Sequence, residues 1–127
     1  MKLMALFESM SGAKVKDCIE NDKLIFIVEE NEMGKAIGKN GANIKRIENV
    51  LKKKIRLVEF SDDIVQFVRN LIYPAEALDI KKDDAIVTIY GKDTSARAML
   101  IGRERQNIKS INSIAKRYFG IDEIKVA

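Results

Sequence analysis

Histidine and tryptophan are absent from the 127 residues of this chain, and cysteine and proline occur once each. Without histidine, the chain cannot build a Ser/His/Asp or Cys/His triad, or a zinc site of histidine and cysteine ligands. The lone Cys18 excludes an intramolecular disulfide, and we interpret it as a small strand residue. We therefore expect no catalytic residues, no metal and no cofactor.

Long hydrophobic runs are also missing. The longest apolar run spans residues 24–28, far below the ~20 residues that a membrane helix needs. The first ten residues have too short an apolar stretch for a signal peptide. We expect a cytoplasmic protein with no membrane partner.

One sequence pattern occurs twice, 64 residues apart. Residues 37–47 read IGKNGANIKRI, and residues 101–111 read IGRERQNIKSI. The identical pairs are Ile37/Ile101, Gly38/Gly102, Asn43/Asn107, Ile44/Ile108, Lys45/Lys109, Ile47/Ile111 and Lys52/Lys116. Such internal repetition indicates two copies of one structural unit.

The flanking sequence predicts the same order of elements in both copies, which is helix, strand, strand, helix, helix, strand. In the first copy we expect helices over 3–10, 32–37 and 42–53, and strands over 15–19, 24–28 and 55–60. In the second we expect helices over 62–72 and 94–101 (capped by Asp93), strands over 75–80, 85–90 and 121–126, and a turn over 81–84. The prediction is an α+β fold with domains 1–60 and 61–127, rigidly abutted because no flexible linker separates them.

The helix that follows the glycine motif is amphipathic in both copies. The predicted buried side chains are Ile44, Ile47, Val50 and Leu51 in the first copy, and Ile108, Ile111, Ile114, Ala115 and Tyr118 in the second. The opposite faces carry lysine and arginine. For one isolated helix, a simple solvated face would explain this arrangement.

The distribution of charge argues for more than a solvated face. Residues 35–56 carry a net charge of +7 and residues 97–117 carry +5, although the whole chain carries only +4. The rest of the chain is therefore at −8. Because a solvated surface usually mixes charges, this segregation predicts a polyanion site.

Gly38 and Gly41 bracket a four-residue loop between two predicted helices. Glycines allow the tight turn, and the backbone N–H groups, the next helix N-terminus and Lys39 all favour an anion. The alternative is a helix–turn–helix that needs glycine for geometry only. The spacing of Gly34, Gly38 and Gly41 fits neither a Walker loop nor a dinucleotide fingerprint.

The order of a helix, a Gly-x-x-Gly loop and a second helix resembles the KH RNA-binding domain, whose loop clamps about four nucleotides. The element order resembles the type II form. Two such modules resemble the tandem KH unit of the NusA transcription factor family in its short archaeal form, and segments 6–13, 36–41 and 58–61 are particularly similar. The implied fold is two tandem type II KH domains, each a three-stranded sheet packed with three helices.

The resemblance also implies where single-stranded RNA would lie. In the first copy the implied contacts are Gly38, Lys39, Asn40, Gly41 and Lys45 for the backbone, and Ile37, Ile44 and the strand around 25–28 for the bases. In the second copy they are Gly102, Arg103, Arg105, Ile108 and Lys109. The second loop lacks the closing glycine and contains Glu104, so we expect a looser approach there, offset by forked arginine contacts to phosphate.

The implied function is an RNA-binding factor in transcription elongation, termination or antitermination, with RNA polymerase or other transcription factors as partners. Two alternatives stay open: a KH factor in ribosome assembly or RNA processing, and a scaffold whose basic face meets an acidic protein. An enzyme is least favoured, because Asp62-Asp63 and Asp83-Asp84 stand where capping and turn residues are expected.

Overall fold

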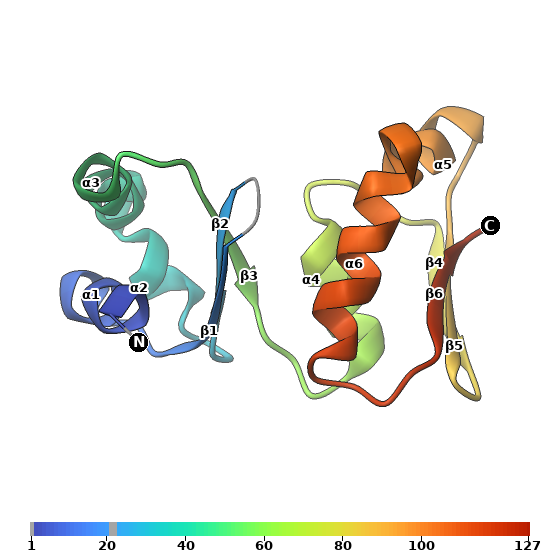
Figure 1. The fold of residues 1–127 in the computed structure, drawn as a ribbon, viewed down its shortest axis with the longest axis horizontal. Coiled ribbons are helices and arrows are strands. Elements are labelled where there is room, and N and C mark those ends of the chain that lie inside the picture. Colours follow the sequence, from blue (N-terminus) through green and yellow to red (C-terminus); the bar gives the residue numbers. More distant parts are fainter. Residues whose placement is uncertain (1, 21–22) are drawn as a thin grey trace. The chain divides into compact units, whose positions relative to one another are not determined.

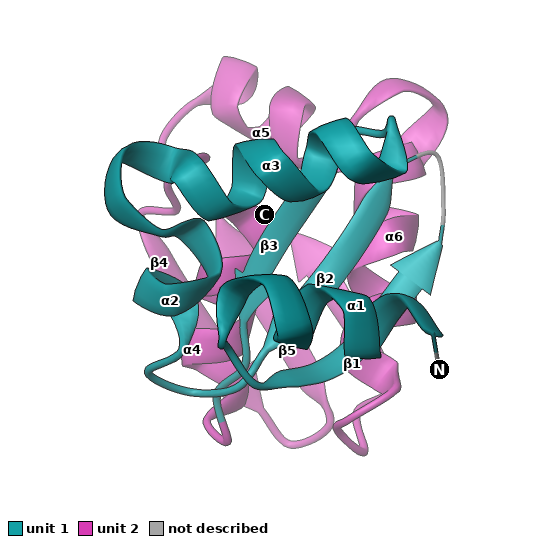
Figure 2. Ribbon diagram, turned by 90° about the vertical axis from the view of Figure 1, so that its left-hand side faces the viewer, with its two compact units in different colours: residues 1–61 teal, residues 62–127 magenta. Residues whose placement is uncertain are grey.

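The computed structural model describes residues 2–20 and 23–127. The chain divides into two compact units, Met1–Ser61 and Asp62–Ala127 (Figure 2). The sequence places this boundary one residue earlier. Each unit contains helices and one three-stranded sheet, so the chain is α+β.

The described residues follow the predicted order of elements in both units (Figure 1). Unit 1 contains α1 (Lys2–Ser11), β1 (Val15–Glu20), β2 (Leu24–Val28), α2 (Met33–Ile37), α3 (Ala42–Leu51) and β3 (Ile55–Glu59). Unit 2 contains α4 (Ile64–Ile72), β4 (Asp79–Asp83), β5 (Ile86–Tyr90), α5 (Thr94–Ile101), α6 (Gln106–Lys116) and β6 (Glu123–Val126). One 3-10 turn joins the last two helices of each unit, Lys39–Gly41 in unit 1 and Arg103–Arg105 in unit 2.

The two sheets have the same topology. The central strand pairs antiparallel with the strand before it and parallel with the last strand, in the orders β1-β2-β3 and β4-β5-β6. A parallel pair needs a crossover connection. In each unit that crossover is the helix–loop–helix segment, so the repeated glycine motif lies in the connection that completes the sheet.

Two aspartates define helix starts in unit 2. The Asp93 carboxylate accepts a hydrogen bond from the Ala96 N–H at 2.8 Å, as predicted for the cap of α5. Asp63 accepts from the Val65 N–H at 3.1 Å, so α4 begins at Ile64, two residues later than the sequence predicts. Asp63 therefore caps α4, which is the role expected for the acidic pair Asp62-Asp63.

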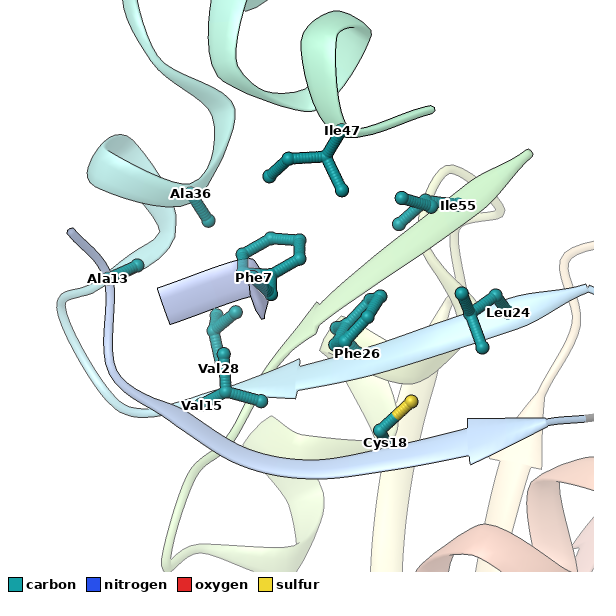
Figure 3. Packing of buried hydrophobic residues seen from close by; sticks show 10 residues of the cluster. All are labelled: Phe7, Ala13, Val15, Cys18, Leu24, Phe26, Val28, Ala36, Ile47 and Ile55. Carbon is teal, nitrogen blue, oxygen red and sulfur yellow. The ribbon is translucent and has the colours of Figure 1, made fainter. Parts of the chain in front are cut away.

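The core of unit 1 lies between its sheet and its three helices, which cover one face of the sheet (Figure 2). Phe7 of α1 packs on Phe26 of β2, with ring centroids 4.4 Å apart (Figure 3). Burial of each ring stabilises the fold by about 2 kcal/mol. The buried cluster consists of Phe7, Ala13, Val15, Cys18, Leu24, Phe26, Val28, Ala36, Ile47 and Ile55.

Cys18 belongs to this core, as expected for a small strand residue (Figure 3). Burial raises the pKa of its thiol, and the nearby Glu20 and Asp17 carboxylates raise it further. A raised pKa opposes formation of the reactive thiolate, so the environment of Cys18 suits packing.

In unit 2, α4 and α6 lie on one face of the sheet (Figure 1). Phe67 of α4 contacts two aromatic rings beyond α6, with centroid distances of 5.7 Å to Tyr118 and 5.6 Å to Phe119. The sheet contributes the buried residues Ile80, Val87, Ile89 and Ile124. No helix among the described residues is long and apolar enough to cross a membrane.

The strand predicted over 75–80 and the turn predicted over 81–84 are wrong. The strand (β4) instead spans Asp79–Asp83, and the turn is limited to Asp84 and Ala85. Ile80 is the buried residue of β4 and pairs with Ile89, which fixes the register. The polar residues that follow it stay in the strand because their side chains reach solvent.

The helical pattern predicts that Val50 is buried, and this prediction is wrong because its side chain is 56% exposed. The buried arc of α3 is centred on Ile47, with Ile44 and Leu51 packed beside it. Val50 lies at the far edge of that arc. In α6, by contrast, Ile108, Ile111, Ile114 and Ala115 are buried as predicted.

Candidate functional site

The first glycine loop has an unusual backbone. Gly38 ends α2 with φ 76° and ψ 171°, and Asn40 and Gly41 both take left-handed conformations, with φ of 56° and 74°. The Gly38 N–H donates to the Gly34 carbonyl at 2.9 Å, and the Gly41 N–H donates to the Gly38 carbonyl at 3.1 Å. The loop is thus a closed turn between two helices.

The second loop has the same backbone although its closing residue is Arg105. Gly102 has φ 77° and ψ 169°, and Glu104 and Arg105 have φ of 55° and 63°. Its two hydrogen bonds, from Gly102 to Ala98 and from Arg105 to Gly102, measure 2.9 and 3.1 Å. The two loops therefore differ in side chains and share one conformation.

The first glycine of each loop is required by its surroundings. A Cβ on Gly38 would lie 2.7 Å from Cγ of Asn43, and a Cβ on Gly102 would lie 2.7 Å from Cγ of Asn107. At Gly41 the nearest atom to such a Cβ is Cε of Lys45, at 3.7 Å. Position 41 has room for a side chain, which explains how Arg105 stands at the equivalent position.

Asn43 braces the first loop, and Asn107 braces the second loop in the same way. The Asn43 side-chain amide donates to the Lys35 carbonyl at 2.8 Å, and that of Asn107 donates to the Met99 carbonyl at 2.9 Å. Each asparagine thereby ties the start of one helix to the end of the preceding helix. This role does not follow from the residue type alone, although the identity of Asn43 and Asn107 in the two repeats is a signal for it.

Backbone amides at the tip of each loop are available to a ligand. No acceptor for the N–H groups of Lys39 and Asn40 is found among residues 2–20 and 23–127. The equivalent groups of Arg103 and Glu104 likewise have none within the described residues. Such N–H groups beside a helix N-terminus are suited to binding an anion.

The predicted contact residues of unit 1 lie on the loop and the first turn of α3, with Ile37 at the end of α2. Lys39, Asn40 and Lys45 are exposed, Gly38, Gly41 and Ile44 are half-buried, and Ile37 is 39% exposed. The strand around 25–28 does not join them. Its side chains are buried, with Phe26 and Val28 inside the core, so its assignment to the groove is wrong.

Three of the five predicted contact residues of unit 2, Arg105, Ile108 and Lys109, border a groove of about 520 Å³, and Gly102 and Arg103 do not. One wall is α6 with the end of its loop, formed by Arg105, Ile108, Lys109, Asn112, Ser113 and Lys116. The other wall is Ile86, Asp122 and Glu123. Arg103, Arg105 and Lys109 are exposed, whereas Gly102 is half-buried and Ile108 is buried with its side chain at the groove.

The basic residues near the first loop differ in their availability. Arg46 donates to the Met10 carbonyl at 2.6 Å, and Lys35 lies 3.6 Å from Glu32. Lys39 and Lys45 have no acidic partner in the described part of the chain. These two lysines are therefore the cations that the loop can offer to a ligand.

Glu48, the one acid within the basic segment 35–56, has a structural role. Its carboxylate accepts a hydrogen bond from the Ile55 N–H at 2.9 Å, tying α3 to the start of β3. In unit 2 the equivalent residue, Asn112, accepts from the Ile124 N–H at 2.7 Å. The same helix-to-strand tie is thus made by a charged residue in one unit and a neutral one in the other.

The profile of the KH domain matches residues 3–73 of this chain. The "Probable transcription termination protein NusA" of Methanococcus vannielii is 39% identical over 127 residues, which cover 97% of this chain and 73% of the relative. The protein of the same name from Halococcus morrhuae is 33% identical over 130 residues, covering 100% of this chain and 94% of the relative.

The similarity extends to a solved structure. The crystal structure of APE1850 superposes with a TM-score of 0.77 at 27% sequence identity. The superposition covers 99% of this chain and 96% of that one. Both units are therefore included in the similarity.

Proposed function

Because the chain belongs to the KH domain family, as an archaeal-type NusA-like member, we propose that it is a single-stranded RNA-binding transcription factor. Both units are then type II KH domains. The proteins named as transcription termination factors support a role in termination or antitermination. The chain acts by binding, without catalysis.

The observation that carries the proposal is the loop of unit 1. It combines two backbone N–H groups that have no acceptor within the described residues, a helix N-terminus, and the exposed cations Lys39 and Lys45. A phosphodiester fits this combination, because the amides donate to its oxygens and the lysines supply positive charge. Gly41 keeps the approach to the backbone open.

Base contacts would be made beside the loop. The apolar side chains beside the loop are Ile37, which is exposed, and Ile44, which is half-buried. Only unpaired bases can turn their faces toward such side chains, which favours a single strand over a duplex. In unit 2, Arg103 and Arg105 add side-chain contacts to phosphate, and Ile108 and Lys109 contribute from α6.

The protein partners proposed on the same grounds are RNA polymerase or another transcription factor, in the cytoplasm. Ribosome assembly and RNA processing are the competing roles for an RNA-binding chain of this kind. Sequencing the RNA that crosslinks to the protein in cells distinguishes them. We expect diverse nascent transcripts, whereas enrichment of ribosomal RNA precursors would contradict the transcription role.

The loop assignment is tested by changing Lys39→Asp and Asn40→Asp together. We expect the affinity for a single-stranded RNA dodecamer to fall at least about tenfold, which corresponds to about 1.4 kcal/mol, because carboxylates would face the phosphates. The measurement is fluorescence anisotropy. Thermal unfolding of the same variant checks that it remains folded.

The matched control combines Lys2→Asp and Ser9→Asp, which make the same charge change at exposed positions of α1. The control should bind RNA nearly as the parent does. A folded loop variant with unchanged affinity would overturn the loop assignment. Equal losses in the loop variant and the control would show that only net charge matters.

A further inference from the structure

One face of the second sheet carries no helix of unit 2. Helices α4 and α6 cover the other face (Figure 1), where Ile80, Val87 and Ile89 are buried. Successive side chains of a strand point to opposite faces. The side chains on the uncovered face are therefore Asp79, Lys81, Asp83, Ile86, Thr88, Tyr90, Glu123 and Lys125.

Strand register places two lysines in one row across this face. Thr88 of the central strand β5 is paired with Lys81 of β4 and with Lys125 of β6. Tyr90 follows Thr88 on the same side of β5, and its side chain is 37% exposed. Nζ of Lys81 lies 5.9 Å from the centroid of the Tyr90 ring. An aromatic ring and two cations thus share one open surface.

This surface is hollowed, and the border of the hollow is basic, whereas the whole face carries two lysines (Lys81 and Lys125) and three acids (Asp79, Asp83 and Glu123). It holds a depression of about 470 Å³ bordered by Lys81, Lys82, Asp83, Ile86, Thr88, Tyr90 and Lys125. The border contains three lysines and one aspartate, although the chain outside the two basic segments is at −8. Lys81 forms an ion pair with Asp79 at 3.8 Å on this face, and both side chains are exposed, so the pair contributes little stability.

We propose that this face is a second RNA-binding surface, on which an unpaired base stacks on Tyr90; it adjoins the groove of unit 2, because Ile86 borders both hollows. The flanking phosphates contact Lys81 and Lys125, and Ile86 and Thr88 form the floor. An aromatic ring with neighbouring cations is the arrangement by which proteins bind single strands with little sequence preference. The proposal rests on the proposed function, because the ligand is the same class of strand.

The absence of tryptophan from the chain provides a direct probe. In a Tyr90→Trp variant the new indole is the only one, and stacking by a base should quench its fluorescence. The matched control is Tyr73→Trp, at another tyrosine of unit 2, which is 73% exposed. We expect oligouridylate and oligoadenylate dodecamers to quench the indole at position 90 by at least about half, with little change at position 73.

The same titration is repeated with Lys39→Asp and Asn40→Asp added, which separates this surface from the first loop. Quenching at position 90 that persists at higher RNA concentration supports an independent surface. No quenching in either background, while the loop-intact protein still binds RNA, would overturn this proposal and leave the proposed function standing. A response to polyglutamate and not to RNA would overturn it in favour of an acidic protein partner.

A second measurement compares Tyr90→Phe with Tyr90→Ala in otherwise unchanged protein. Phenylalanine keeps the ring, so the dodecamer affinity should stay within twofold of the parent. Alanine should lower it about fivefold. Equal effects of the two substitutions would contradict stacking on the ring.

Discussion

Gly38 and Gly41 both have positive φ, but the loop needs them for different reasons. Gly38 has a backbone conformation that is open to glycine almost alone, and Asn43 fills the space that a side chain would need. Gly41 has an ordinary left-handed conformation and open space around it. Arg105 in the second loop shows that a side chain is compatible with that position.

Replacing each glycine by alanine should therefore have unequal effects on stability. We expect Gly38→Ala to lower the free energy of unfolding by about 3 kcal/mol, through backbone strain and the clash with Asn43. Gly41→Ala should cost only about 1 kcal/mol, the strain of a left-handed residue. Urea unfolding measures both, and Arg105→Gly is the control, with little or no loss expected. Equal costs at positions 38 and 41 would contradict this account.

The roles of some single residues can be predicted from the sequence, and the roles of others cannot. The glycines and the repeated lysines could be identified as loop and cationic residues because their chemistry is apparent from type and spacing. Asn43 could not be assigned, because its partner is the Lys35 carbonyl, eight residues earlier on another helix. Such a contact depends on the angle between two helices, which local sequence does not specify.

At the scale of elements, side chains from one element satisfy the backbone of another. The start of α2 is an example, because the Glu32 carboxylate accepts a hydrogen bond from the Lys14 backbone N–H at 2.8 Å. That bond joins the α2 cap to the residue before β1. It lowers the pKa of Glu32, and Lys35 lowers it further.

The lowered pKa predicts a pH dependence of stability. Glu32 binds its proton more weakly in the folded state than in the unfolded chain, where its pKa is about 4.3. Its contribution is thus fully present above that value and is lost as pH falls through the lower folded pKa. Glu32→Gln should flatten the fall of unfolding free energy below pH 4.3, measured by urea unfolding between pH 3 and 6. An unchanged slope in this variant would contradict the role of Glu32.

The helices and strands differ in how reliably a sequence pattern predicts their bounds. Strand β2 was predicted with its observed bounds because a continuous apolar run suits a central strand, and α5 because Asp93 marks its start. Strand β4 was misplaced because it has one buried residue, Ile80, and is defined by hydrogen bonds to β5. A strand whose side chains mostly face water leaves little periodicity to read.

At the scale of the whole molecule, charge is divided between the two basic segments and an acidic remainder. One chain carries both loops, so a strand that reaches both gains from the effective concentration of the second site. Each phosphate contact should also release counterions, giving a slope of about −0.7 in a plot of log affinity against log salt.

Changing Arg103→Ala and Arg105→Ala together should therefore make the salt slope for a dodecamer shallower by about 1.4, if each guanidinium contacts one phosphate. Anisotropy titrations between 50 and 300 mM salt test this. Lys2→Ala with Lys92→Ala, outside the basic segments, is the charge-matched control. The same change of slope in the control would contradict the importance of charge segregation.

The sequence was sufficient to predict the duplication, the order of elements, the two loops and the concentration of positive charge beside them. These follow from signals that act over a few residues, namely glycine conformation, helix caps and apolar periodicity. The folded arrangement was needed to show that Asn43 braces the loop and that Glu48 ties a helix to a strand. It also decided that Lys81, Tyr90 and Lys125 share one face, because strand register brings together residues that the sequence keeps far apart.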